Sequence, residues 1–177
     1  MRDLASAESV RRLLRELGRA AGAPARVYLV GGATAVLAGW RETTIDVDFR
    51  IEPDDDLLRH LPRLKDQLGV NIELASPADF LPELPGWRER SPFRFREGPL
   101  EVFDYDLYSQ ALAKLERGLA HDLADVDAMV SSGDVDPRRL LELFEAIEPE
   151  LYRFPAVESD GLRAAVQQLR SAGPSTA

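Results

Sequence analysis

Apolar positions in the first half of the chain change from a helical to a strand spacing. An amphipathic helix is predicted by the i, i+3, i+4, i+7 pattern of Val10, Leu13, Leu14, Leu17 and Ala21. Ser6 is placed to cap this helix and Gly22 to end it. Runs rich in apolar and β-branched residues then predict strands at 26–30, 45–51 and 70–74. Between the first two strands, Gly31 and Gly32 lead into a short helix at 33–38 that Gly39 ends.

A helix before the third strand and a hairpin after it complete this part of the pattern. Pro53 and the three aspartates at 54–56 are typical of a helix start, and Pro62 should kink or split that helix. Its apolar positions are Leu57, Leu58, Leu61, Leu64 and Leu68. Phenylalanine and arginine alternate over 93–96, Gly98 and Pro99 form a turn, and residues 100–103 return, which predicts a β-hairpin.

From residue 106 the pattern is helical throughout. Helices are predicted at 107–118, at 120–131, from Asp136 and Pro137 to residue 147, and at 160–171. The fold class is therefore α/β: a small mixed β-sheet with helices packed on it, followed by a helical C-terminal half. We expect residues 1–105 to form the α/β core, and residues 106–177 to form a helical region that contributes to the same site.

Composition narrows the functional classes. The 177 residues contain no cysteine and only two histidines, which excludes thiolate metal sites and disfavours a histidine-rich zinc site. No apolar run approaches the roughly 20 residues of a membrane span, and the charged N-terminal residues do not resemble a leader, so we expect a cytoplasmic protein without membrane contact. The net charge of −9 argues against general nucleic-acid binding. A local basic cluster remains, consisting of Arg88, Arg90, Arg94 and Arg96, and its alternative interpretation is a solvated hairpin face.

Two carboxylates on the second strand carry the strongest chemical signal. Asp46 and Asp48 are two residues apart, so on a strand they project to one face while Ile45, Val47 and Phe49 project to the core. Like charges at this distance are costly unless a cation compensates them. The pair therefore predicts a metal-cation site, with a solvated strand face as the alternative.

A glycine pair precedes these carboxylates. Gly31 and Gly32 stand where a strand passes into a helix, so backbone N–H groups and a helix N-terminus can face a phosphate; the alternative is an ordinary tight turn. Thr34 and Thr44 offer hydroxyls near the same site, although Thr44 can equally cap the strand entry. On the third strand, Glu73 would sit beside Asp46 and Asp48 if that strand pairs with the second, where it could orient a metal or accept a proton from an attacking hydroxyl. The alternative is an exposed strand glutamate.

Further charged residues follow on the predicted helices at 107–118 and 120–131. Lys114 offers a compact positive charge for phosphates, and Asp122 and Asp125 share one helix face. Spacing alone favours a solvated helix surface for all three. His121 is interpreted as structural rather than as a metal ligand.

These residues resemble the nucleotidyltransferase superfamily with the DNA polymerase β-type minimal fold. Its pattern is an apolar strand, Gly-Gly or Gly-Ser, a short helix, and Asp-x-Asp on the next strand, which Gly31, Gly32, Asp46 and Asp48 match. Within it, the chain is similar to the AbiEii-like toxin branch: Thr44 stands two positions before the first aspartate, and Lys114 to Arg117 and Asp122 to Asp125 match that branch's Lys-x-x-Arg and Asp-x-x-Asp. The resemblance covers about residues 26 to 130.

The resemblance implies an Mg²⁺-dependent transfer of NMP from an NTP to an acceptor hydroxyl. Gly31, Gly32, Thr34, Thr44 and Lys114 would then contact the nucleotide, Asp46 and Asp48 would hold Mg²⁺, and Asp122 or Asp125 would complete the catalytic site. It further implies a toxin of a bacterial toxin–antitoxin system that acts on tRNA, with a cognate antitoxin protein as partner and Thr44 as the residue that the antitoxin modifies. Alternatives are a non-catalytic nucleotide-binding or antitoxin-type module and an antibiotic-modifying nucleotidyltransferase.

Overall fold

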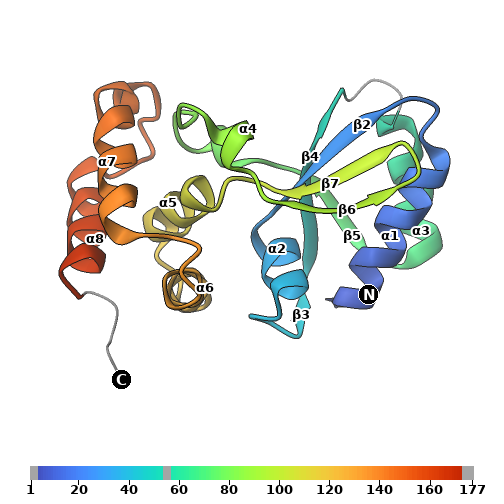
Figure 1. Ribbon diagram of the computed structural model, residues 1–177, viewed down its shortest axis with the longest axis horizontal. Helices are drawn as coiled ribbons and strands as arrows, with labels where there is room; N and C mark the ends of the chain where they lie inside the picture. The colour runs from blue at the N-terminus through green and yellow to red at the C-terminus, as the bar shows by residue number, and fades with distance from the viewer. Residues whose placement is uncertain (1–3, 54–56, 173–177) are drawn as a thin grey trace. The chain divides into compact units, whose positions relative to one another are not determined.

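A computed structural model describes residues 4–53 and 57–172 (Figure 1). The chain divides into two compact units. The first, called the sheet unit here, comprises the residues up to Ser76 together with Ser91–Tyr105. The second, the helical unit, comprises Pro77–Arg90 together with the residues from Asp106 onward. The boundary after residue 105 lies where the sequence changes from strand to helix patterning. Pro77–Arg90 precedes this boundary in the sequence but belongs to the helical unit.

The sheet unit is built on a five-stranded mixed sheet, which confirms the predicted fold class. Its strand order is β5-β4-β2-β7-β6. Strand β2 pairs antiparallel with β4 and parallel with β7, β4 pairs parallel with β5, and β6 and β7 form the predicted hairpin. The strands are β2 (Ala25–Val30), β4 (Asp46–Glu52), β5 (Asn71–Leu74), β6 (Phe93–Glu97) and β7 (Leu100–Asp104). A separate two-stranded sheet, β1 (Ala5–Ser6) with β3 (Thr43–Thr44), was not predicted because two residues show no periodicity.

Helices of the sheet unit follow the predicted pattern, with small differences at their ends. They are α1 (Ala7–Ala20), α2 (Gly31–Ala38), the 3₁₀ helix η1 (Leu58–His60) and α3 (Leu61–Leu68). Ser6 caps α1 by accepting a hydrogen bond from the backbone N–H of Ser9, as expected. The helix ends at Ala20, before Gly22 is reached. Pro62 stands at the start of α3 and splits the predicted helix into η1 and α3; the three aspartates at 54–56 lie outside the described residues.

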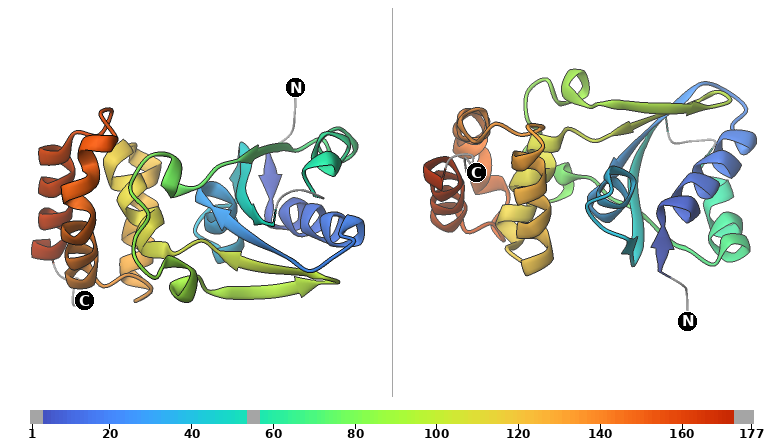
Figure 2. Two further views of the ribbon diagram at one scale, coloured as in Figure 1. Left: turned by 90° about the horizontal axis from the view of Figure 1, so that it is seen from above. Right: turned by 60° about the horizontal axis from the view of Figure 1, so that its bottom comes forward.

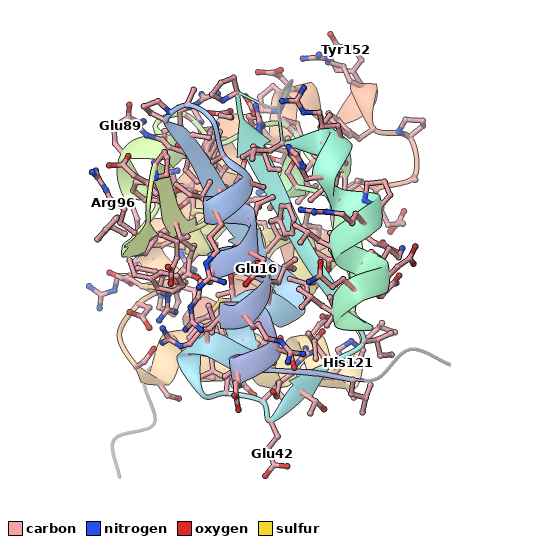
Figure 3. The ribbon with its side chains drawn as sticks, turned by 90° about the vertical axis from the view of Figure 1, so that its right-hand side faces the viewer. Glu16, Glu42, Glu89, Arg96, His121 and Tyr152 are labelled. Atoms are coloured by element: carbon pink, nitrogen blue, oxygen red, sulfur yellow. The ribbon has the colours of Figure 1, made fainter. Side chains whose placement is uncertain are left out.

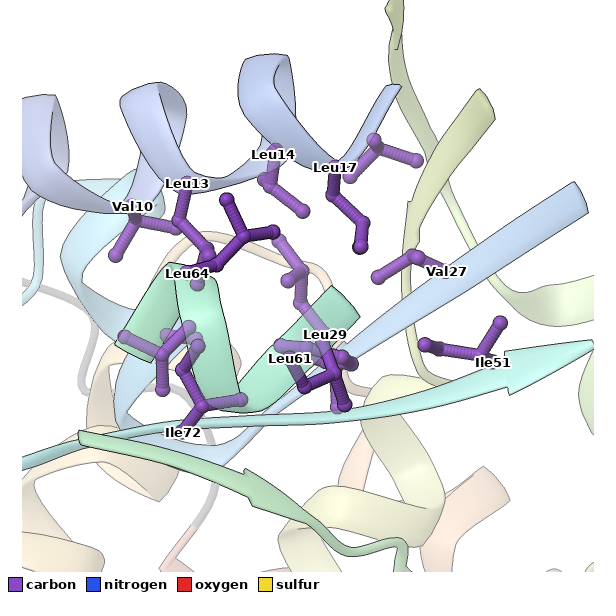
Figure 4. Packing of buried hydrophobic residues seen from close by; sticks show 14 of the residues in the cluster. Val10, Leu13, Leu14, Leu17, Val27, Leu29, Ile51, Leu61, Leu64 and Ile72 are labelled. Atoms are coloured by element: carbon purple, nitrogen blue, oxygen red, sulfur yellow. The ribbon is translucent and has the colours of Figure 1, made fainter. Parts of the chain in front are cut away.

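One face of the sheet carries the apolar core, and α1 and α3 lie on that side (Figures 2 and 4). The core is formed by side chains of the two helices and by alternate residues of the strands, among them Leu13, Leu17, Val27, Leu29, Val47, Phe49, Leu64, Ile72 and Val102. Glu16 lies on the outer side of α1 (Figure 3). Ile45 does not join this core as predicted, since it precedes β4 and is 70% exposed. Asp46 and Asp48 therefore project from the opposite face of the sheet, away from this core.

The helical unit contains the four predicted helices and three short segments that were not predicted. The predicted helices are α5 (Leu107–Arg117), α6 (Ala120–Ser131), α7 (Pro137–Ile147) and α8 (Ser159–Ala172). Asp136 caps α7 and Gly118 ends α5 in the left-handed conformation, as their residue types indicate. The short segments are η2 (Pro77–Asp79), α4 (Trp87–Arg90) and η3 (Glu148–Arg153). None of the described helices is long and apolar enough to cross a membrane.

A bidentate ion pair explains why 77–90 belongs with the helices that follow residue 105. Arg90 donates from Nε to Asp106 Oδ1 at 3.1 Å and from a terminal nitrogen to Asp106 Oδ2 at 2.8 Å. Asp106 is fully buried and also caps α5 through the N–H and hydroxyl of Ser109. A buried carboxylate with four donors fixes the position of α4 against α5.

Candidate functional site

The second face of the sheet gathers polar side chains on β4 and β5. Asp46 and Asp48 are partly exposed and alternate with the fully buried Val47 and Phe49. The parallel register places Asn71 beside Asp46 and Glu73 beside Asp48. Register partners project to the same side of a sheet, so the four polar residues share one face. This confirms the conditional prediction that Glu73 lies next to the aspartates if β5 pairs with β4.

Asn71 is a site residue that the sequence pattern did not reveal. Its side-chain amide donates a hydrogen bond from Nδ2 to Asp46 Oδ1. Such a bond restrains the orientation of the Asp46 carboxylate. In the sequence, Asn71 stands two residues before Glu73 on a predicted strand, so the two side chains were expected on the same face. Its place beside Asp46 follows only from the register of β5 on β4.

The glycine pair, which follows the C-terminal end of β2, lies beside the N-terminal end of β4, which carries the two aspartates. Because β2 and β4 are antiparallel, Val30 at the end of β2 lies opposite Asp48 near the start of β4. Gly31 has a positive φ of 57°, and a Cβ atom there would lie 3.5 Å from Asp48 Oδ2. At Gly32 a Cβ would lie 1.9 Å from Thr44 Oγ1, which no side chain can accommodate. Glycine is therefore required for α2 to begin this close to β3 and β4.

Both candidate threonines use their hydroxyls to bind backbone carbonyls. Thr44 Oγ1 donates to the Asp46 carbonyl oxygen at 3.0 Å, which shapes the entry to β4. Thr34 Oγ1 donates to the Leu29 carbonyl oxygen at 3.1 Å, and the residue is 0% exposed. Thr34 thus stabilises the junction of β2 and α2 from inside, away from solvent. Thr44 is buried beside Gly32.

The donor set at this edge fits a hard divalent cation shared with a phosphate group. Mg²⁺ is commonly held by one or two carboxylates, with phosphate oxygens and water completing its coordination. Asp46 and Asp48 supply the carboxylates, and α2 begins beside them without a side-chain cap. Among the described residues, no three His, Cys, Asp or Glu side chains are grouped to hold a metal, so Glu73 does not form a three-carboxylate cluster with the pair.

In the helical unit, Lys114, Asp122 and Asp125 form a buried ion-pair network, which corrects the spacing-based interpretation of a solvated surface. Lys114 is 3% exposed, Asp122 0% and Asp125 2%. Lys114 Nζ lies 2.6 Å from Asp125 Oδ2 and 3.4 Å from Asp122 Oδ1. Arg117 adds two hydrogen bonds of 2.6 Å to Asp122. Two cations and two anions therefore neutralise one another between α5 and α6.

Burial and ion pairing act in opposite directions on Asp122. Burial by itself raises the pKa of this carboxyl, but the hydrogen bonds from Arg117 and the charge of Lys114 outweigh it, so that its pKa is lowered. His121 Nε2 lies 3.6 Å from the same carboxylate and its side chain is more than half exposed. The network links the two helices, and the action of Lys114, Asp122 and Asp125 on a nucleotide stays a prediction.

The basic cluster at 88–96 is neutralised by local carboxylates. Arg94 Nε lies 2.5 Å from Asp104 Oδ2, Arg96 pairs with Glu101, and Arg90 pairs with Asp106 as described above. The guanidinium of Arg88 lies over the ring of Trp87, 4.4 Å from its centroid. The cluster is also divided between the two units, at residue 91. These arginines therefore do not form a continuous basic docking surface within either unit.

Comparison of the chain with models of protein families, with curated proteins and with solved structures gives no match. The resemblance to the nucleotidyltransferase superfamily accordingly rests on the residues themselves, and both the superfamily and its AbiEii-like branch stay predictions.

Proposed function

We propose that this protein is an Mg²⁺-dependent nucleotidyltransferase that transfers an NMP from an NTP to an acceptor hydroxyl. The observation that carries the proposal is the approach of the Gly31-Gly32 turn to the Asp46/Asp48 strand, with a Cβ at Gly31 only 3.5 Å from Asp48 Oδ2. A side-chain-free helix start next to two aligned carboxylates is the arrangement that a metal-bound triphosphate needs.

In this proposal each residue has a limited task. Backbone N–H groups at the start of α2 bind phosphate oxygens, and Asp46 and Asp48 hold the Mg²⁺. When bound, the cation neutralises charge on the phosphates. Asn71 restrains the Asp46 carboxylate through a hydrogen bond from its amide to Oδ1, which would orient that carboxylate as a ligand of the cation. Thr44 supports the approach of Gly32.

The reaction is a displacement at the α-phosphate. The acceptor hydroxyl oxygen forms a bond to the α-phosphorus, the bond from that phosphorus to the bridging oxygen breaks, and pyrophosphate leaves with the bond electrons. Glu73 is exposed on the same face as Asp48, and we assign it to accept the proton of the hydroxyl. Positioning of the two reactants on one sheet face supplies much of the rate enhancement.

The acceptor is proposed to be tRNA, as in the toxins that the chain resembles, with a cognate antitoxin as regulator. One observation favours a second candidate, a cationic small molecule such as an aminoglycoside. The net charge is −9, and Arg90, Arg94 and Arg96 are each paired with a carboxylate. A negatively charged surface attracts a polycationic drug and repels RNA.

Incubation with each of the four α-³²P-labelled NTPs and Mg²⁺ tests the proposal, with total tRNA, a protein extract or aminoglycosides as separate acceptors. We expect transfer of label to one acceptor class, and its loss in Asp46→Asn and in Asp48→Asn. Glu16→Gln is the matched control, because it removes one negative charge from the outer side of α1 in the same unit (Figure 3). Unchanged transfer in both aspartate variants would refute the assignment.

Calorimetry separates the enzyme from the non-catalytic alternative. Binding of Mg²⁺-NTP without transfer to any acceptor would favour a nucleotide-binding or antitoxin-type module. Growth arrest on expression, abolished by Asp48→Asn and relieved by a co-encoded neighbouring gene, would favour the toxin. Absence of both NTP binding and transfer in the wild-type protein would remove the proposed function.

A further inference from the structure

The outer face of α1 carries more positive than negative charge, although the protein as a whole is acidic. The helix contains four arginines and two glutamates, whereas the whole chain has 22 basic and 31 acidic residues. Figure 3 looks onto this face, with Glu16 near its middle. Every exposed residue of the helix is charged; these residues are Glu8, Arg11, Arg12, Arg15 and Arg19.

Most of the positive charge on α1 is not neutralised within the protein. Arg19 pairs with Glu16, at 2.5 Å between nitrogen and oxygen. In the described part of the chain, no carboxylate pairs with Arg11, Arg12 or Arg15. Apart from the Arg19 pair, the helix therefore presents three arginines and a single glutamate.

Arg11 is positioned without the use of its N–H donors. Its guanidinium carbon lies 5.0 Å from the ring centroid of Phe95, a residue that packs against the core. A cation is attracted to the face of an aromatic ring, whereas the N–H groups of a guanidinium lie in its own plane. The charge of Arg11 is therefore held in place before a partner binds, and its donors stay available.

The neighbouring charges on α3 and beside β3 do not cancel this excess. Helix α3 lies next to α1 and carries Arg63 and Lys65 against one acidic residue, Asp66 (Figures 2 and 3). Glu42 stands beside β3 and points away from α1 (Figure 3). The layer formed by α1 and α3 is therefore positive as a whole.

The start of α1 lies at the end of the sheet that carries the proposed metal site. Ser6, directly before α1, pairs with Thr43 on β3, and β4 begins at Asp46 soon after. Gly18, near the end of α1, lies against Glu97 beside the turn of the β6–β7 hairpin. The arginines at 11, 12 and 15 therefore stand about 6–12 Å along the helix from the metal-site end. The three aspartates at 54–56 follow the other end of β4 in the sequence.

A phosphate backbone fits this face better than a protein surface does. The centres of protein interfaces are depleted in charged residues and enriched in aromatic ones. None of the large apolar side chains that are exposed in the described residues belongs to α1. Arginine forms bidentate hydrogen bonds with phosphate. Arg11, Arg15 and Arg19 recur at every fourth residue, a rise of about 6 Å, and so form a row along which several phosphates can bind.

We propose that the arginine face of α1, formed by Arg11, Arg12, Arg15 and Arg19, is a docking surface for the sugar–phosphate backbone of an RNA acceptor. The arginines contact phosphates, and the bound strand passes the start of α1 toward Asp46 and Asp48. The inference rests on the proposed function in taking RNA as the acceptor of the NMP, but RNA binding itself requires no transfer. Local positive charge allows a chain with a net charge of −9 to bind RNA.

Fluorescence anisotropy with fluorescein-labelled unfractionated tRNA, at about 50–200 mM salt, tests the docking surface. The combined variant Arg11→Gln/Arg12→Gln/Arg15→Gln should weaken binding at least about tenfold at the lowest salt concentration. The slope of log K against log salt concentration should become shallower by about 2–3, because each lost phosphate contact removes about 0.7–0.9 from it. Lysine at the same three positions should retain most of the affinity, since the charge is kept.

A matched variant separates the local contacts from the overall charge. Arg138→Gln/Arg139→Gln/Arg170→Gln removes three exposed arginines of the helical unit and changes the net charge by the same amount. It should bind tRNA within about twofold of the wild type. Far-UV circular dichroism verifies that both combined variants are folded.

Three results would overturn the docking surface directly. They are equal weakening in both combined variants, an unchanged salt slope in the α1 variant, and absence of tRNA binding by the wild type. Poly-glutamate that displaces tRNA as well as poly-uridylate does would also overturn it, because an acidic protein would then fit the face equally. A changed oligomeric state of the α1 variant in sedimentation would assign the face to a second copy of the chain and overturn it likewise.

The outcomes are distinct from those of the transferase test. Asp48→Asn should bind tRNA as tightly as the wild type even where it abolishes transfer. The α1 variant should raise the KM for tRNA and leave the rate at saturating tRNA unchanged. Transfer to an aminoglycoside without tRNA binding would overturn the docking surface and leave the transferase intact. tRNA binding with the expected salt slopes but without transfer to any acceptor would support the surface and remove the proposed function.

Discussion

Replacement of Gly32 by alanine should strongly destabilise the sheet unit. The new Cβ would lie 1.9 Å from Thr44 Oγ1 and 2.7 Å from Thr44 Cβ, far inside van der Waals contact. Thr44 cannot move away freely, because it is buried, belongs to β3 and donates to the Asp46 carbonyl. Relief therefore requires a shift of α2 or of the β4 entry, and overpacking of this kind costs about 1–3 kcal/mol. We expect a loss of about 3 kcal/mol, measured by urea unfolding with far-UV circular dichroism.

A double-mutant cycle identifies the contact responsible. Thr44→Gly removes the three atoms nearest to the new methyl group, so Gly32→Ala should cost much less in that background. Gly22→Ala is the control, since a Cβ there has no neighbour within 4 Å, and it should change the free energy of unfolding by less than about 1 kcal/mol. A Gly32→Ala protein as stable as the wild type, or a cycle with additive energies, would refute the reasoning.

Three further predictions concern the charged groups. Lys114→Met should reduce the free energy of unfolding by about 3–5 kcal/mol in urea titrations, because the buried Asp125 loses its cation; a cost below about 1 kcal/mol would contradict the network. Because the pKa of Asp122 is lowered in the folded state, its contribution to stability is present above the ordinary value of 3.8 and lost as the pH falls through the lower folded value. The stability difference between wild type and Asp122→Asn should therefore shrink on acidification, and a constant difference across an acid series would contradict this. Asn71→Ala should raise the Mg²⁺ concentration for half-maximal transfer several-fold, since Asp46 loses a hydrogen bond that orients its carboxylate; an unchanged Mg²⁺ dependence would exclude this positioning role.

Much of the local structure could be predicted because it depends on neighbouring residues. The spacing of leucines on α1 and its Ser6 cap, the splitting of a helix at Pro62, and the start of α7 at Asp136 all follow from contacts within a few residues. The alternation on β4 likewise indicated that Asp46 and Asp48 face away from the core, as they do. Ile45 was placed incorrectly in the core because the strand begins one residue after it.

Lys114 shows why the charged helix surfaces were misjudged. A lysine at the edge of an apolar helix stripe and two aspartates in the next helix are typical of solvated faces. The reversal at Gly118 folds α6 back along α5, so these charges meet and are buried together. Only the packing of one helix on the other decides whether such residues face solvent or one another.

The sequence by itself determined the order and type of the principal elements, the mixed α/β class and the Gly31-Gly32 and Asp46-Asp48 pairs, because these depend on periodicity and residue chemistry over short spans. The tertiary structure decided which strands are neighbours, and so brought Asn71 to Asp46, Glu73 to Asp48, and the arginines of β2 and β6 to Glu101. Strand register and helix packing join residues that are far apart in the chain, and no local pattern encodes such distances.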